Sequence, residues 1–95
     1  MPKVARLADA EIATRLAALP GWTLQASKLH REWRFPDFVA AFGFMTRVAL
    51  LAEAMNHHPE WSNVYNRVVV DLTTHDAGGI SERDFTLAER MSQLT

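Results

Sequence analysis

The alternation of apolar and polar residues in the first third of the chain predicts one helix followed by a hairpin. Residues 9–19 carry Ile12, Leu16 and Leu19 at helical spacing, and the turn-forming pair Pro20-Gly21 ends that pattern. Residues 22–25 then alternate between apolar and polar types, as a half-buried strand does, and residues 26–28 favour a turn. Residues 29–35 alternate again, so the two short stretches are expected to pair as strands.

The longest apolar segment, residues 37–56, is predicted to be a helix that starts after Pro36, with favourable negative charge from Asp37. It carries two apolar stripes, whereas a helix that covers a sheet needs only one. One stripe consists of Phe38, Phe42, Met45, Ala49 and Ala52, and the other of Phe44, Val48, Leu51 and Met55. The second stripe is expected to need a partner, either another helix of the domain or another subunit.

The last third of the chain is expected to add two strands and a helix. Residues 61–65 and 68–74 read as strands around a tight turn at Asn66-Arg67, and residues 76–79 form a glycine-containing loop. Ser81 and Asp84 have the spacing of a capping box, with Ile80 and Phe85 placed as a hydrophobic staple. The helix runs to about residue 94, with Phe85, Ala88 and Met91 on its inner face. The whole order predicts an α+β fold, a four-stranded antiparallel sheet with three helices packed on one face.

Composition narrows the class of protein. A chain of 95 residues fits a single domain, residues 1–95, with a modest core that association with further copies would help. The net charge is −1 and basic residues form no run, so nucleic-acid binding has no support. Cysteine is absent, which excludes disulfides and thiolate metal sites. We see neither a secretory signal nor an apolar run near 18 residues, so we expect a cytoplasmic protein without a membrane role.

The residues that could take part in catalysis are concentrated at positions 53–61, EAMNHHPEW, where the long helix ends. His57 and His58 diverge in regular structure, but before Pro59 the backbone is irregular and both can face a common cleft. His75 follows a strand, and imidazole exchanges protons near neutral pH, so these three histidines with Glu53, Asp76 and Asp84 form a candidate acid/base site.

Plainer interpretations remain open for the same residues. The histidines can simply complement the helix dipole, and Asp84 can simply cap its helix. A zinc site is a further alternative, although the spacing of two histidines on one helix face is missing. The tryptophans are expected in the core or at its rim, and one beside a polar cleft can stack on a flat heterocycle.

The spacing of these residues resembles the pterin-4a-carbinolamine dehydratase family. Glu53 precedes His57-His58-Pro59, and then follow Trp61, Tyr65, His75 and Asp84, at intervals that rarely coincide by chance. The resemblance extends upstream through residues 42–50, FGFMTRVAL, and the Pro20-Gly21-Trp22 turn, and it covers about residues 9–94. The implied fold is the α+β domain described above, and family members are dimers or tetramers.

The resemblance implies a reaction and a set of site residues. The reaction is loss of water from a 4a-hydroxytetrahydropterin to give the quinonoid dihydropterin, in cofactor recycling and without a metal or organic cofactor. His57, His58 and His75 are implied to share the acid and base roles, and their assignment stays open. The implied substrate-binding residues are Trp22, Glu53, Asn56, Pro59, Thr73, Thr74, Asp76, Arg83 and Asp84. The best-known members have aspartate at the position of Asn56 and glutamate at the position of Asp76. Both positions lie in the implied pterin-binding segments, so the differences bear on the affinity for pterin more than on the chemistry.

Two alternatives of other classes stay open beside the dehydratase. The first is a protein-binding cofactor, because animal members of the family also stabilise a dimeric transcription factor through the helical surface used for self-association. The second is a metal-dependent hydrolase built on the three histidines. An intact histidine set favours the dehydratase, because a pure scaffold does not need it.

Overall fold

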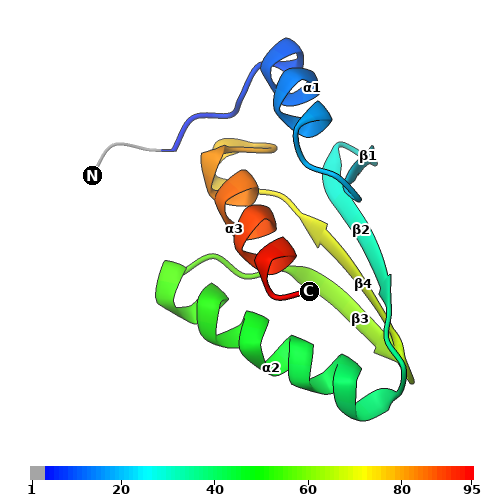
Figure 1. Cartoon of the computed structure of the whole chain (residues 1–95). Coiled ribbons are helices and arrows are strands. Elements are labelled where there is room, and N and C mark those ends of the chain that lie inside the picture. Colours follow the sequence, from blue (N-terminus) through cyan, green and yellow to red (C-terminus); the bar gives the residue numbers. More distant parts are fainter. Residues whose placement is uncertain (1–3) are drawn as a thin grey trace.

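A computed structural model describes residues 4–95 and shows a sheet covered on one face by helices (Figure 1). The remaining three residues of the predicted domain lie outside the described part. The helices are α1 (Asp9–Ala17), α2 (Phe38–Met55) and α3 (Glu82–Gln93), and the strands are β1 (Thr23–Gln25), β2 (Lys28–Arg34), β3 (Glu60–Val64) and β4 (Arg67–Leu72). A short 3-10 helix, η1 (His75–Ala77), follows β4.

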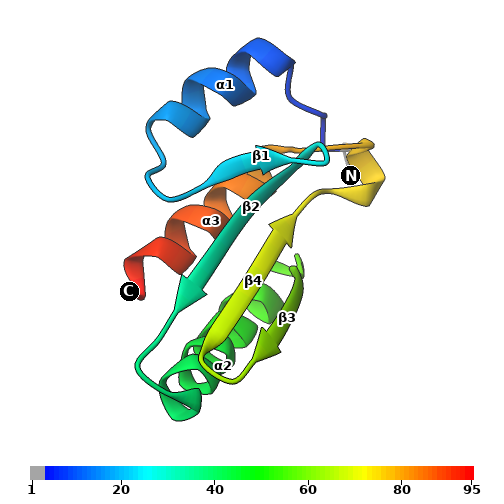
Figure 2. The same ribbon diagram turned by 90° about the vertical axis from the view of Figure 1, so that its right-hand side faces the viewer.

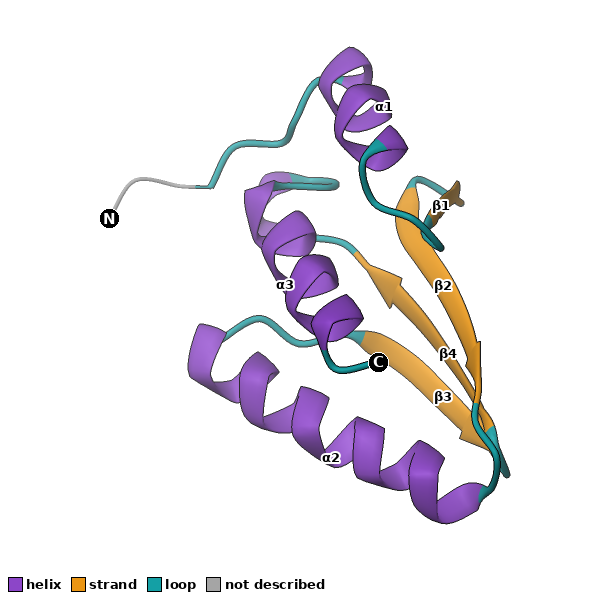
Figure 3. Ribbon diagram, viewed as in Figure 1, coloured by secondary structure: helices purple, strands orange, loops and turns teal. Residues whose placement is uncertain are grey.

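The strands form one antiparallel sheet in the order β1-β2-β4-β3. Figures 2 and 3 show the three helices on the same side of this sheet, with α1 beside the β1 end and α2 beneath β3 and β4. The predicted α+β fold, with three helices packed on one face of a four-stranded antiparallel sheet, is therefore confirmed.

The two hairpin turns differ from the predicted ones in detail. Ala26 and Ser27 form the β1–β2 turn with φ angles of 51° and 61°, values that favour glycine or asparagine. The β3–β4 turn lies at Tyr65-Asn66, one residue before the predicted Asn66-Arg67, because Arg67 already pairs with Val64 in the sheet. β1 also differs from the expected half-buried strand, since all three of its residues are exposed.

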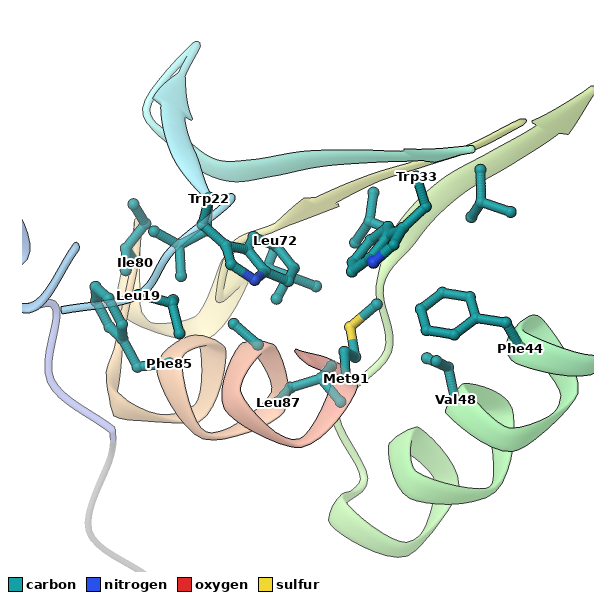
Figure 4. Close-up of a cluster of buried hydrophobic side chains, with 14 of the residues drawn as sticks. Leu19, Trp22, Trp33, Phe44, Val48, Leu72, Ile80, Phe85, Leu87 and Met91 are labelled. Carbon is teal, nitrogen blue, oxygen red and sulfur yellow. The ribbon is translucent and has the colours of Figure 1, made fainter. Parts of the chain in front are cut away.

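The core lies between the inner face of the sheet and the helices (Figure 4). Alternation along β2 and β4 turns Leu29, Trp33 and Leu72 inward, and the facing side of α3 supplies Phe85 and Met91. The predicted inner face of α3 is confirmed. Ile80 and Phe85, the predicted staple, are both buried in this core.

The long helix α2 packs with a different stripe from the one expected. Phe44 and Val48 have no exposed surface and lie in the core, so of the two partners left open for their stripe the structure shows the domain itself and not another subunit. They share one helix face with Ala41 and Ala52, as a spacing of three and four residues requires. The large hydrophobic residues exposed on α2 are Phe38, Val39, Phe42 and Leu50.

The length and composition of α2 also correct a prediction. Its 18 residues are apolar enough to cross a membrane by these two criteria, so the expected absence of such a run is wrong. The helix nevertheless has a defined place in this fold. Four of its residues are buried where it contacts β4 and α3, and the rest of the helix is exposed or half-buried.

Candidate functional site

An open cleft of about 250 Å³ lies where the end of α2, the segment after β4 and the start of α3 meet. All three predicted catalytic histidines line it. Five of the predicted substrate-binding residues line it as well, namely Asn56, Thr73, Thr74, Asp76 and Arg83. The structure thus brings together residues from three separate segments of the chain.

The end of α2 gives the two adjacent histidines opposite surroundings. Asn56 takes the left-handed conformation with φ of 51°, which asparagine tolerates better than most residues. The His57 backbone N–H donates to the Ala52 carbonyl and the Asn56 N–H to the Glu53 carbonyl, the pattern of a Schellman motif. After this turn His57 is only 8% exposed, whereas the His58 side chain is 57% exposed.

His57 faces a carboxylate that is fully buried. Its Nε2 lies 2.5 Å from Oδ1 of Asp84, in the first turn of α3. The other carboxylate oxygen, Oδ2, accepts from the Ser81 backbone N–H at 2.9 Å and from the Thr74 hydroxyl at 2.8 Å. The Thr74 hydroxyl uses its one hydrogen on Asp84, so the Ser81 hydroxyl, which accepts from the Arg83 backbone N–H, donates its own hydrogen to the Thr74 oxygen, 2.6 Å away.

These contacts determine where the hydrogen of His57 lies. A carboxylate only accepts hydrogen bonds, so the His57 Nε2 that faces Asp84 carries a hydrogen and donates it. A neutral His57 then has its free lone pair on Nδ1, the ring nitrogen that Asp84 does not hold. The predicted capping box at Ser81 is confirmed, and the same aspartate holds a cleft histidine. Asp84 therefore both caps α3 and contacts a histidine of the cleft.

His58 has an exposed carboxylate partner instead. Its Nε2 lies 2.9 Å from Oε1 of Glu53, whose side chain is 83% exposed. Water competes for both groups, so this contact orients the ring weakly in comparison with the His57–Asp84 pair. Glu53 supports the cleft through His58 and is not part of its lining.

His75 lies on the opposite edge of the cleft, in η1. Backbone hydrogen bonds in both directions between Thr74 and Gly79 close the loop that carries it. Its side chain is 86% exposed, and its Nε2 lies 3.5 Å from Oε2 of Glu60 in β3. Lys28 of β2 donates to the other oxygen of Glu60 at 2.5 Å.

The Lys28–Glu60 contact lowers the pKa of the partner of His75. The hydrogen bond from Lys28 lowers the pKa of the Glu60 carboxyl, and the positive potential of Lys28 and of a protonated His75 acts in the same direction. Sequence reasoning missed both residues. Glu60 directly follows His-His-Pro, which is a usable local signal, whereas Lys28 lies 32 residues away and reaches Glu60 only across the folded sheet.

Two predicted site residues lie elsewhere. Trp22 is 4% exposed, its indole N–H donates to the Ser92 hydroxyl, and its ring packs edge-on against Trp33. It has no free face for a heterocycle, so its prediction as a substrate-binding residue is wrong. Pro59 is half-buried and does not line the cleft, and it acts on the site by directing the chain from His58 into β3.

The zinc site considered as an alternative has no matching cluster of ligands in residues 4–95. Within that range the structure shows no group of three or more histidine, aspartate or glutamate side chains close enough to hold one ion. The three histidines of the cleft instead face three different carboxylates.

Comparison with known proteins finds relatives that share one family name. A family model described as pterin 4 alpha carbinolamine dehydratase matches residues 5–94. A protein of Prochlorococcus marinus (strain MIT 9303), provisionally named a pterin-4-alpha-carbinolamine dehydratase, is 68% identical over 76 residues, 80% of this chain and 79% of its own. A Solibacter usitatus protein of the same provisional name is 58% identical over 89 residues, 94% of each chain.

A solved structure is also similar over nearly the whole chain. The crystal structure of a transcriptional coactivator/pterin dehydratase from Brucella melitensis matches with a TM-score of 0.91 and 44% sequence identity, covering 94% of this chain and 97% of that one. The sequence and the fold both match proteins of one family, and the chain belongs to the pterin 4 alpha carbinolamine dehydratase family.

Proposed function

We propose that this protein removes water from a 4a-hydroxytetrahydropterin, by histidine acid/base catalysis in the cleft, as a step in the recycling of a tetrahydropterin cofactor. Family membership supports the reaction class. The observation that supports acid/base catalysis by histidine is the buried His57–Asp84 pair, together with two exposed histidines on the same cleft.

The reaction requires one proton to be delivered and one to be removed. An acid protonates the hydroxyl on C4a, the C4a–O bond breaks with its electron pair, and water leaves. A base takes the proton from the neighbouring ring nitrogen N5, and the C4a–N5 double bond of the quinonoid dihydropterin forms. No electrons are exchanged with another molecule, so the balance needs no external oxidant or reductant.

His57 suits the role of the base. Its Nε2 hydrogen is held by Asp84, which leaves the Nδ1 lone pair to accept a proton. Protonation makes the imidazole positive, and the carboxylate of Asp84 stabilises that charge in a site with little access for water. A carboxylate that already receives two hydrogen bonds at its other oxygen holds this geometry without reorganising.

His58 and His75 suit the role of acid. They lie on the two sides of the cleft, both exposed enough to be reprotonated from water after each turnover. A hydroxyl on either face of the pterin ring then has an imidazole within reach of one side. Polar groups of Asn56, Thr73 and Asp76 remain to bind the ring by hydrogen bonds, beside the charge of Arg83.

The test is the rate of 4a-hydroxytetrahydropterin dehydration, followed by absorbance. His75→Ala is expected to lower kcat/KM by about 10²-fold, the scale of a lost acid or base, and its exposed position leaves the fold intact. His57→Gln keeps an N–H donor for Asp84 and is expected to lose at least as much. The matched control is His30→Ala, because His30 is the fourth histidine and lies on the outer face of the sheet, paired with Asp71.

The possible outcomes have different meanings for the proposal. If His30→Ala loses as much activity as His75→Ala, the effect is not specific to the cleft. If wild type, shown to be folded by circular dichroism, gives no acceleration, the dehydratase proposal fails. If only His57→Gln is inactive, His75 is removed from the mechanism while the cleft keeps its role.

A second candidate function is association through the exposed face of α2. Phe38, Val39, Phe42 and Leu50 leave an apolar surface there, and the similar protein of Brucella melitensis carries the name of a coactivator as well as of a dehydratase. We propose that this face joins copies of the chain into a dimer or tetramer. Phe42→Asp is expected to lower the mass measured by light scattering, and Leu24→Asp, an exposed apolar position on β1, is the control.

A further inference from the structure

All three histidines of the cleft present the same ring nitrogen, Nε2, to a carboxylate. The three contacts are His57 with Asp84, His58 with Glu53, and His75 with Glu60. A carboxylate only accepts hydrogen bonds, so the facing Nε2 carries a hydrogen, and Nδ1 is the nitrogen that each ring has free to exchange a proton. The sequence pointed to the first two carboxylates, whereas it gave Glu60 no role, and the shared geometry points to one.

The loop that carries His75 holds its backbone and leaves its side chain free to turn. The Gly78 N–H donates to the His75 carbonyl at 3.0 Å, and Thr74 and Gly79 exchange two hydrogen bonds at 2.9 and 3.2 Å. These bonds place Cα and Cβ of His75, but the χ1 torsion still has three staggered wells. The imidazole is largely exposed, and within residues 4–95 its one charged partner is Glu60, 3.5 Å from Nε2. Glu60 is therefore the group that can select one well.

Glu60 is itself held by the sheet and by Lys28. It is the first residue of β3 and lies opposite Asp71 of β4, so both side chains are on the outer face. Lys28 lies two residues before His30 in β2, on the same face, and reaches across β4 to donate to Oε1 of Glu60 at 2.5 Å. The other oxygen, Oε2, is the one that faces His75. A carboxylate that is held at one oxygen presents the second in a defined direction.

We propose that Glu60 is a positioning residue of the dehydration, which holds the imidazole of His75 in the rotamer that delivers a proton to the hydroxyl on C4a, while Lys28 holds Glu60. The inference rests on the proposed function, in which His75 serves as an acid. The protonated ring gives up its Nδ1 hydrogen, keeps the Nε2 hydrogen toward Glu60, and regains a proton from water. Glu60 does not line the cleft, so it acts through His75.

The experiment measures kcat and KM for Glu60→Ala, made both in the wild type and in the His75→Ala variant. In the wild type the loss of the carboxylate lets the ring sample all three χ1 wells, so kcat is expected to fall about threefold with little change in KM. In the His75→Ala variant the same substitution is expected to have no effect, because no ring is left to orient. Glu60→Gln keeps an oxygen that can accept from Nε2 and is expected to recover part of the loss.

Asp71→Asn is the matched control. Asp71 is a carboxylate on the same face, directly opposite Glu60 in the sheet, and its contact is with His30 instead of a histidine of the cleft. The variant is expected to leave kcat unchanged. A loss equal to that of Glu60→Ala would mean that the negative charge of the outer face matters and not the contact with His75, which overturns the proposal. Equal losses from Glu60→Ala in the wild type and in the His75→Ala variant also overturn it.

A second measurement does not depend on turnover. The Hα–Hβ couplings of His75, measured by NMR, report the populations of its χ1 wells. Wild type is expected to show one dominant rotamer, and Glu60→Ala is expected to show couplings averaged over several. Averaged couplings in a wild type that dehydrates the substrate overturn the role of Glu60 and leave the dehydratase assignment standing. A wild type that gives no acceleration overturns the proposed function, and the role of Glu60 in that reaction with it.

Discussion

Two histidine–aspartate pairs lie on opposite sides of the sheet and have different surroundings. His57 and Asp84 meet in the helical layer, 2.5 Å apart, and Asp84 has no exposed surface. His30 and Asp71 meet on the outer face of the sheet, 2.8 Å apart, as directly opposed residues of β2 and β4, and both keep part of their surface in water. The chemical groups are the same, and the difference is how far solvent can replace the partner.

That difference determines what each pair does. Water can hydrogen-bond Asp71 if His30 is lost, so the outer pair contributes little to stability. The buried Asp84 has no such substitute, and each of its oxygens must find a donor within the protein. Its position therefore couples the helix cap at Ser81, the hydroxyl of Thr74 and the ring of His57. A catalytic base needs an imidazole ring that is held in one orientation. The outer pair does not hold the ring of His30 in this way, because water can replace either partner.

The largest effect is expected from Asp84→Ala. It leaves the Ser81 N–H, the Thr74 hydroxyl and the His57 ring without an acceptor, so the free energy of unfolding should fall by about 3–5 kcal/mol. Asp71→Ala is the matched variant on the outer face and should cost about 1 kcal/mol or less. Urea unfolding of both variants gives the comparison.

A second variant keeps the test informative if Asp84→Ala does not fold. Asp84→Asn retains an oxygen for the capping interactions and is expected to lose less stability, while kcat falls because the imidazolium of His57 loses its negative partner. Equal losses of stability in Asp84→Ala and Asp71→Ala would show that burial does not distinguish the two pairs.

A smaller effect is expected from Thr74→Val, which removes one donor from the buried network and keeps its shape. The Asp84 oxygen Oδ2 then retains only the Ser81 N–H. We expect a loss of about 1–2 kcal/mol in the free energy of unfolding, and a fall in kcat with little change in KM if Thr74 acts by positioning Asp84. Thr14→Val is the control, because Thr14 is exposed on α1 and its hydroxyl donates to the Ala10 carbonyl of the same helix. A variant of Thr74 with unchanged stability and kcat would separate the hydroxyl from the function of Asp84.

The contrast between these pairs also explains what the sequence could predict. The order of elements, the capping box at Ser81 and the inward faces of β2, β4 and α3 follow from local periodicity and spacing, and each is confirmed. The sequence places His57 and Asp84 in one candidate site, but the contact between them depends on how the end of α2 meets α3. Local pattern contains no information on that approach.

The failures have the same physical origin. On α2 both apolar stripes have helical periodicity, and only tertiary packing selects the one with Phe44 and Val48 for the core. Trp22 was expected at the cleft because the Pro-Gly turn before it matches the family pattern, but the turn directs its ring into the core. The link of Lys28 to His75 through Glu60 has no counterpart in sequence spacing, because it runs across three strands and a loop.

The smallest effect is expected at that outer-face link, from Lys28→Met. Because the hydrogen bond from Lys28 lowers the pKa of Glu60 in the folded protein, the variant should raise that pKa toward the ordinary value of a glutamate, as carboxyl NMR titration measures. A folded pKa below the unfolded one gives stability that is present above the unfolded value and is lost as the pH falls through the folded value. The urea midpoints of wild type and variant should therefore differ slightly at pH 7 and converge in acid. Added salt should reduce the difference, since the Lys28 ammonium and the Glu60 carboxylate both reach solvent. A difference that persists in acid or in salt would mean that Lys28 acts through packing of its aliphatic stem, and the outer-face link would then resemble the buried pair more than its exposure indicates.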